Sequence, residues 1–190
     1  FAFIQAGGWM RPILTSDNPV YQPALARLNL ALFALVPIGV ALLVRKQPFY
    51  SGLGSGRMVG ANVRLGLALA FGTLFLRGKF NLVADGVSPD ETSMLLVSAA
   101  ICAAEEFVFR GFIQFRLRSW LGENRGWIAT AGLFVLWQIP FWWAAGDALW
   151  VNLVYTIAQA VVLGLVAQRS KHILAPMLYR TFSEWLFFVS

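Results

Sequence analysis

The sequence of 190 residues is poor in cysteine, histidine and charge. It contains one cysteine, Cys102, one histidine, His172, and only 13% charged residues. A single cysteine cannot close a disulfide within the chain, and a single histidine cannot form a multi-histidine metal site. Soluble domains carry about 25% charged residues. The shortage of charge therefore excludes an ordinary water-soluble domain. Because histidine and cysteine are so scarce, we also expect no metal and no cofactor.

The chain is instead rich in hydrophobic residues. They make up 58% of the chain, and the mean hydropathy is +0.66. The 15 Lys and Arg against 9 Asp and Glu give a net charge of +6, but the basic residues mostly lie between apolar runs, where they act as topology signals. The composition predicts an integral membrane protein whose partners include lipids and exclude nucleic acid.

Six apolar runs follow one another along the chain. They cover residues 28–44, 58–76, 94–115, 127–143, 149–167 and 173–188. A helix of about 20 residues crosses a hydrocarbon core of about 30 Å. The pattern predicts an all-α, multi-pass bundle of about six transmembrane helices. Residues 1–27 form a lead-in, and residues 28–190 form the transmembrane domain.

Basic residues gather in every second loop of this bundle. The three basic loops carry Arg45, Lys46 and Arg57, then Arg116, Arg118 and Arg125, then Arg169 and Lys171. Of the alternate loops, the one between the second and third runs contains Arg77 and Lys79 beside Asp85, Asp90 and Glu91, and the one between the fourth and fifth runs contains Asp147. Cytoplasmic loops carry an excess of Lys and Arg, so we expect both termini on the non-cytoplasmic side.

Some polar side chains lie inside the predicted spans rather than between them. They are Glu105, Glu106, Arg110, Gln138, Arg180 and Glu184. A charge at the bilayer centre costs about 2.5–3.5 kcal/mol on insertion scales, so such residues usually face the bundle interior and pair. Two pairs have the i, i+4 spacing of helical neighbours. We expect Glu106 to pair with Arg110 and Arg180 with Glu184.

Glu105 has no cation at helical spacing on its own helix, although Arg180 could reach it from the last span. A desolvated and unpaired carboxylate would suit a general acid or base. Intramembrane ion pairs also serve only to fix helix packing, and a lone amide such as Gln138 is more often an interhelical hydrogen-bond donor than a catalytic group. The five charged residues leave a net charge of −1.

Two other residue types have simpler interpretations. Most of the eight tryptophans, Trp142 and Trp143 among them, have the character of anchors at the membrane interface. His172 follows Lys171 at a loop boundary, where we expect a solvated histidine rather than a metal ligand.

The string EEFVFRG at residues 105–111 resembles the first motif of the CPBP or Abi family of intramembrane proteases, which are related to the CAAX prenyl endopeptidases. Members of that family commonly have a Phe-x-x-x-His motif on the next span, and here Phe134 is followed by Gln138. A later motif follows a small-Pro step, and after Pro176 this chain has Arg180 at the histidine position and Glu184 at the polar one. The resemblance covers roughly residues 58–188.

The resemblance implies a site in which a glutamate activates water for attack on a peptide bond. The family site has been described both as a metalloprotease and as a glutamate-type protease. Glu105 would then be the general base, supported by Glu106 and Arg110. Both histidines are replaced, and neither replacement can do the work of a histidine. Gln138 cannot titrate, and Arg180 is a permanent cation that can neither act as a base nor bind a metal. An arginine that pairs with the glutamates would also remove their freedom to accept a proton.

Three hypotheses about function follow from these residues. The first is a non-catalytic pseudoenzyme that serves as a structural or partner-binding subunit of a membrane assembly. The second is an active glutamate-type protease that cleaves prenylated or membrane-embedded peptides, with Gln138 donating to the oxyanion. The third is a cavity for an amphipathic small molecule or pigment, although the scarcity of histidine argues against ordinary axial ligation of a tetrapyrrole.

Overall fold

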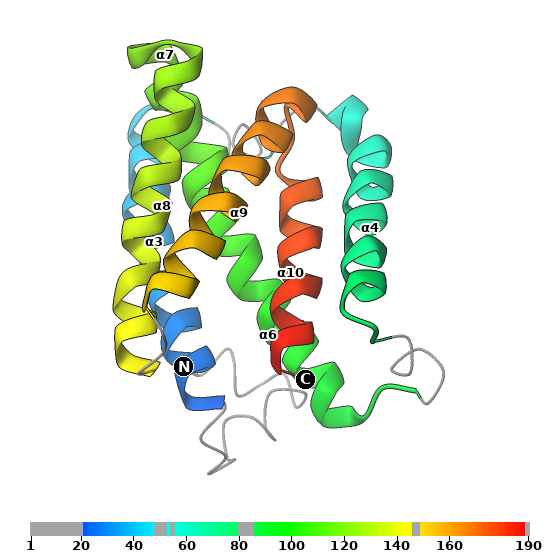
Figure 1. Cartoon of the computed structure of the whole chain (residues 1–190). Helices are drawn as coiled ribbons and strands as arrows, with labels where there is room; N and C mark the ends of the chain where they lie inside the picture. Colours follow the sequence, from blue (N-terminus) through cyan, green and yellow to red (C-terminus); the bar gives the residue numbers. More distant parts are fainter. Residues whose placement is uncertain (1–20, 48–52, 54–55, 80–85, 146–148, 189–190) are drawn as a thin grey trace.

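The computed structural model describes residues 21–47, 53, 56–79, 86–145 and 149–188, and within these ranges it contains helices and turns but no β-strand. The helices are α3 (Tyr21–Val44), α4 (Val59–Leu76), α6 (Pro89–Glu106), α7 (Phe115–Leu121), α8 (Glu123–Ala145), α9 (Leu149–Ser170) and α10 (Leu174–Phe188). A short 3-10 turn, η3 (Gly56–Met58), precedes α4, and a π-helical segment, η4 (Phe107–Gln114), joins α6 to α7 (Figure 1).

Each of the six predicted apolar runs forms a helix, so the all-α membrane bundle is confirmed. The first helix begins at Tyr21 rather than at residue 28. Pro23 does not prevent this early start, because proline is tolerated in the first turn of a helix. Residues 21–27 of the predicted lead-in are therefore helical. The rest of the lead-in and the loop residues Asp85 and Asp147 lie outside the described residues.

Within the described residues, four helices are long and apolar enough to cross a membrane. They cover Gln22–Val44, Val59–Leu76, Pro89–Leu121 and Trp150–Ser170. Neither α8 nor α10 is among them, and the 15 residues of α10 rise only about 22 Å. The number of spans stays a prediction.

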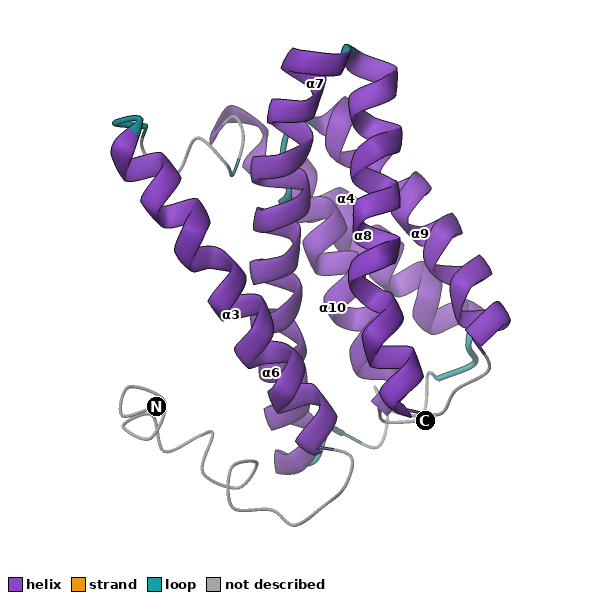
Figure 2. Ribbon diagram, turned by 90° about the vertical axis from the view of Figure 1, so that its left-hand side faces the viewer, coloured by secondary structure: helices purple, strands orange, loops and turns teal. Residues whose placement is uncertain are grey.

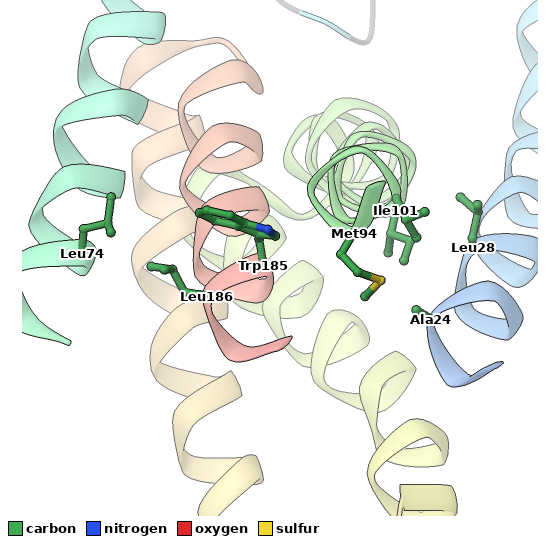
Figure 3. Packing of buried hydrophobic residues seen from close by; sticks show 8 residues of the cluster. Ala24, Leu28, Leu74, Met94, Ile101, Trp185 and Leu186 are labelled. Atoms are coloured by element: carbon green, nitrogen blue, oxygen red, sulfur yellow. The ribbon is translucent and has the colours of Figure 1, made fainter. Parts of the chain in front are cut away.

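The site-bearing helix α6 lies between α3 and α10. Helix α10 packs against α6 on one side and against α4 on the other, while α8 packs against α7 and α9 (Figures 1 and 2). A buried cluster joins α3, α4, α6 and α10, and its members are Ala24, Leu28, Leu74, Met94, Val97, Ile101, Trp185 and Leu186. In Figure 3, α6 is seen end-on with Leu28 on one side and Trp185 on the other. The cluster holds these helices at fixed positions beside the polar site.

The long helix that begins at Pro89 has a strong start and an irregular middle. Ser88 and Glu91 form a capping box, in which each side chain bonds to the other residue's backbone N–H. The α-helix then changes to a π-helix directly after Glu106. Segments of π-helix are rare and frequent at functional sites, and here the change follows the two predicted site glutamates.

The predicted basic loops lie at one end of the bundle. Figure 1 shows the end of α3, the start of α4, the turn between α7 and α8 and the end of α9 at the top. The described basic residues of these segments are Arg45, Lys46, Arg116, Arg118, Arg125, Arg169 and Lys171. Successive helices therefore run in opposite directions, as the alternation of loop charges requires.

Candidate functional site

The two glutamates of the EEFVFR motif lie at the end of α6, with no exposed surface. Arg180 of α10 reaches both of them. Its Nη2 atom lies 2.7 Å from Glu105 Oε2, and its Nη1 atom lies 3.0 Å from Glu106 Oε1. The same Nη2 atom is 2.5 Å from Glu184 Oε1, one turn along α10. The predicted Arg180–Glu184 pair is confirmed, and Arg180 joins three carboxylates.

A second arginine, the last residue of the predicted lead-in, also joins the cluster. Arg27 of α3 donates from Nε and Nη2 to the two oxygens of Glu105, at 2.9 and 2.8 Å. It also donates to both oxygens of Glu184, at 3.1 and 3.0 Å. Its side chain is only 17% exposed. Such paired contacts between a guanidinium and a carboxylate combine charge with fixed geometry.

Helix α8 supplies two uncharged donors to Glu105. Gln138 Nε2 donates to Oε2 at 3.3 Å, which is the interhelical hydrogen bond expected for a lone amide. Trp137 Nε1 donates to Oε1 at 3.0 Å. Glu105 therefore receives donors from α3, α8 and α10, and the condition of an unpaired carboxylate is not met. Trp137 was grouped with the interfacial anchors, and that interpretation is wrong for this residue.

The second predicted pair, Glu106 with Arg110, is also present. Arg110 Nε is 3.4 Å from Glu106 Oε2, and both side chains are buried. The guanidinium of Arg110 also lies 4.3 Å from the centre of the Phe134 ring, and that of Arg180 lies 4.7 Å from the same centre. Phe134 is 1% exposed. The motif phenylalanine therefore offers an aromatic face to two buried cations.

Arg27 changes the charge of the site. Three glutamates now face three arginines, so the formal charges sum to zero rather than the predicted −1. The prediction was wrong because it ended the lead-in at residue 27. With the helix starting at Tyr21, Arg27 lies within α3 and faces α6 and α10. An arginine directly before an apolar run is usually a topology signal, so the sequence did not separate the two roles.

The donor set does not fit a catalytic metal. Gln138 and Arg180 stand where the resemblance places histidines, and the three carboxylates are bound by guanidinium groups. No group of three or more His, Cys, Asp or Glu side chains suited to a metal occurs among the described residues. Each cation already neutralises the carboxylates that a metal would need as ligands.

His172 differs from its prediction. It is 5% exposed, and its Nδ1 atom accepts a hydrogen bond from the backbone N–H of Leu174 at 3.1 Å, at the start of α10. Burial lowers the pKa of His172 below its usual 6.5. The solvated histidine expected at this loop boundary is therefore a buried, neutral one that helps α10 to begin.

These features define a helical membrane protein with a buried Glu-Glu-Arg site. Residues 90–186, about half of the chain, match the family model described as Rce1-like: Type II CAAX prenyl endopeptidase Rce1-like. The chain belongs to this Rce1-like family, which confirms the resemblance. None of the curated proteins and none of the solved structures compared with the chain matches it. The matched region contains the six predicted site residues, whereas Arg27 lies outside it.

Proposed function

We propose that this Rce1-like protein is a pseudo-protease, in which the former catalytic position joins helices instead of hydrolysing peptides. The contact between Arg180 and Glu105 carries the proposal. Arg180 occupies the position where the resemblance places a histidine, and its Nη2 atom lies 2.7 Å from the glutamate that would act as base. An arginine cannot take up or release a proton at working pH.

The environment of Glu105 supports this proposal. A general base needs a free oxygen within reach of the proton that it removes. Arg27 Nε and Trp137 Nε1 occupy Oε1, while Arg27, Arg180 and Gln138 occupy Oε2. Two of these donors are permanent cations, which stabilise the ionised carboxylate and oppose its protonation. Water would have to displace an arginine before Glu105 could activate it.

The proposed role is that of a structural or partner-binding subunit in a membrane assembly. The network joins α3, α6, α8 and α10, so it gives the bundle a fixed shape without a chemical step. Large apolar side chains such as Phe33 and Phe71 remain exposed, where they contact lipid or a membrane-protein partner. Purification in a mild detergent tests this role. A stoichiometric companion supports it, and a solitary, monodisperse monomer contradicts it.

An active glutamate-type protease is the second candidate, favoured by family membership and by the position of Gln138. Its Nε2 atom lies 3.3 Å from Glu105, close enough for the amide to donate to an oxyanion formed beside the carboxylate. The substrate would be a prenylated or membrane-embedded peptide. This mechanism requires both arginines to leave Glu105 when the substrate binds.

A cleavage assay separates the two candidates. The protein and its Glu105→Ala variant are reconstituted in vesicles with a prenylated peptide, beside an active Rce1-like protease as positive control. We expect the two proteins to give the same background cleavage. Cleavage by the unaltered protein that is lost in Glu105→Ala would overturn the pseudo-protease proposal.

We further propose that the basic end of the bundle is cytoplasmic and that both termini are not. Two exposed positions at opposite ends test this orientation, Ser119 on α7 and Thr92 on α6. The native Cys102 is buried and gives little background. In sealed membrane vesicles whose outer surface is the non-cytoplasmic face, a membrane-impermeant maleimide should label Thr92→Cys and leave Ser119→Cys unlabelled. The reverse pattern would invert the orientation.

A further inference from the structure

A groove of about 330 Å³ lies between α4 and α9 at the basic end of the bundle, away from the arginine–glutamate cluster. In Figure 1 the start of α4 and the end of α9 lie next to each other at the top. The lining side chains are Met58, Ala61, Asn62, Leu65, Val166, Arg169 and Ser170. Most of the lining is apolar, and its polar side chains are Asn62 near the start of α4 and Arg169 and Ser170 at the end of α9. The groove is thus amphipathic along its length.

A buried amide in this groove has an unused acceptor. Asn62 is 1% exposed, and its Nδ2 atom donates to the backbone oxygen of Met58 at 2.8 Å. Its Oδ1 atom receives no hydrogen bond from any described residue. Buried polar atoms are nearly always paired. The Asn62 side chain lines the groove, but Oδ1 itself has almost no accessible surface, so a ligand that brings a hydroxyl or ammonium donor reaches this atom only when the side chain turns toward the groove.

A cation lies at the mouth of the same groove. Arg169 is exposed and lines it, and Lys171 follows in the turn to α10. A guanidinium group binds phosphate through two parallel hydrogen bonds. Basic residues just outside the hydrocarbon core also attract anionic lipids. Leu65 and Val166 lie one helical turn further into the bundle than Asn62 and Arg169, so the apolar part of the groove lies on the membrane side of its polar part.

We propose that this groove binds one anionic phospholipid whose head group carries a hydroxyl donor, of the phosphatidylglycerol type. Its phosphate binds Arg169, and a head-group hydroxyl donates to Asn62 Oδ1. The first part of an acyl chain lies along Leu65 and Val166. Charge complementarity at the mouth and the unpaired amide inside both favour this occupant over a zwitterionic lipid without a donor, such as phosphatidylcholine. The site is independent of the proposed pseudo-protease role.

Native mass spectrometry of the whole protein from nanodiscs tests the proposal. The nanodiscs contain equal amounts of phosphatidylglycerol and phosphatidylcholine. We expect one retained phosphatidylglycerol per chain, and about tenfold weaker retention in Arg169→Gln, since the hydrogen bond between the guanidinium and the phosphate is worth about 1.5 kcal/mol. Arg64→Gln is the matched control, because Arg64 is an exposed arginine of α4 outside the groove. It should retain the lipid fully.

Two further arms separate the parts of the proposal. Asn62→Leu should remove the preference for phosphatidylglycerol over phosphatidic acid, which has an anionic phosphate without the head-group glycerol. Added inorganic phosphate should fail to displace the lipid, and displacement would indicate a site for free phosphate instead. Equal retention of both lipids by the unaltered protein, or equal losses in Arg64→Gln and Arg169→Gln, would overturn the proposal. Arg169→Lys keeps the charge and should retain the lipid, and unfolding temperatures verify that each variant is folded.

Discussion

Arg180 Nη2 lies 2.7 Å from Glu105 Oε2, and both side chains are buried. The two residues come from different helices and are 75 positions apart in the chain. Glu105 is the residue that the family resemblance assigns as base, and Arg180 stands at a position where a histidine is expected. Their contact converts a possible proton acceptor into the partner of a permanent cation. The rest of the cluster is arranged around this pair.

Replacement of Arg27 by methionine should destabilise the protein by about 3 kcal/mol. Removing one partner from a buried ion pair leaves the other charge uncompensated, and here both Glu105 and Glu184 lose two hydrogen bonds. Unfolding in detergent, followed by circular dichroism with increasing denaturant, measures the change. Arg64→Met on the exposed face of α4 is the control and should change stability by less than about 0.5 kcal/mol.

A charge-balanced double variant tests the cause of that loss. Arg27→Met combined with Glu184→Met removes one charge of each sign, so the remaining charges again sum to zero. We expect the double variant to lose clearly less stability than the two single losses added together. Strictly additive losses would mean that Arg27 and Glu184 are not energetically coupled.

Phe134→Leu should cost about 1–2 kcal/mol more than a comparable change at Phe109. Leucine preserves an apolar side chain but removes the ring that lies beside Arg110 and Arg180, and a desolvated cation–π contact contributes about 2 kcal/mol. Phe109 packs edge-on against Phe134, with ring centres 5.3 Å apart. Its own replacement by leucine therefore removes an aromatic contact of the same neighbourhood. Equal losses of unfolding free energy would contradict a cation-binding role for Phe134.

Stability should fall as the pH drops below about 6.5 because of His172. Burial lowers the pKa of this residue in the folded protein, so the unfolded chain binds the proton more tightly than the folded one does. Protonation therefore favours unfolding, and stability rises with pH through this window. Protonated Nδ1 also could not accept the N–H of Leu174. Unfolding temperatures between pH 5 and pH 8 measure the effect, and His172→Gln should show a flatter profile.

Much of the fold was predictable because its main cause is local. A long apolar segment in a membrane forms a helix, because no water is present to bond its backbone N–H and C=O groups and a helix satisfies them internally. The six runs became six helical segments for this reason, and the i, i+4 pairs followed from helix geometry. Helix boundaries depend on terminal residues whose preferences are weak. The start of α3 at Tyr21 was therefore missed.

The candidate site was predicted only in part, because its geometry depends on tertiary packing. The polar residues inside the apolar runs could be recognised from the sequence, because placing such side chains in a bilayer costs free energy and therefore usually has a structural or functional reason. Arg27 and Trp137 did not, since an arginine before a span and a tryptophan within one have common roles at the interface. Only the packing of α3 and α8 against α6 shows that both donate to Glu105. The same packing brings Arg27 into the cluster, so the net charge is zero rather than the predicted −1.

A double-mutant cycle between Glu105 and Arg180 tests the central claim most directly. The unfolding free energies of Glu105→Gln, Arg180→Met and the double variant are measured against that of the unaltered protein in the same detergent. If the two residues form the structural ion pair described above, each single change should cost about 3–5 kcal/mol, and the double variant should lose at least 1.5 kcal/mol less than their sum. Additive losses within about 0.5 kcal/mol would contradict the account, because Glu105 would then be independent of the arginine that is said to hold it.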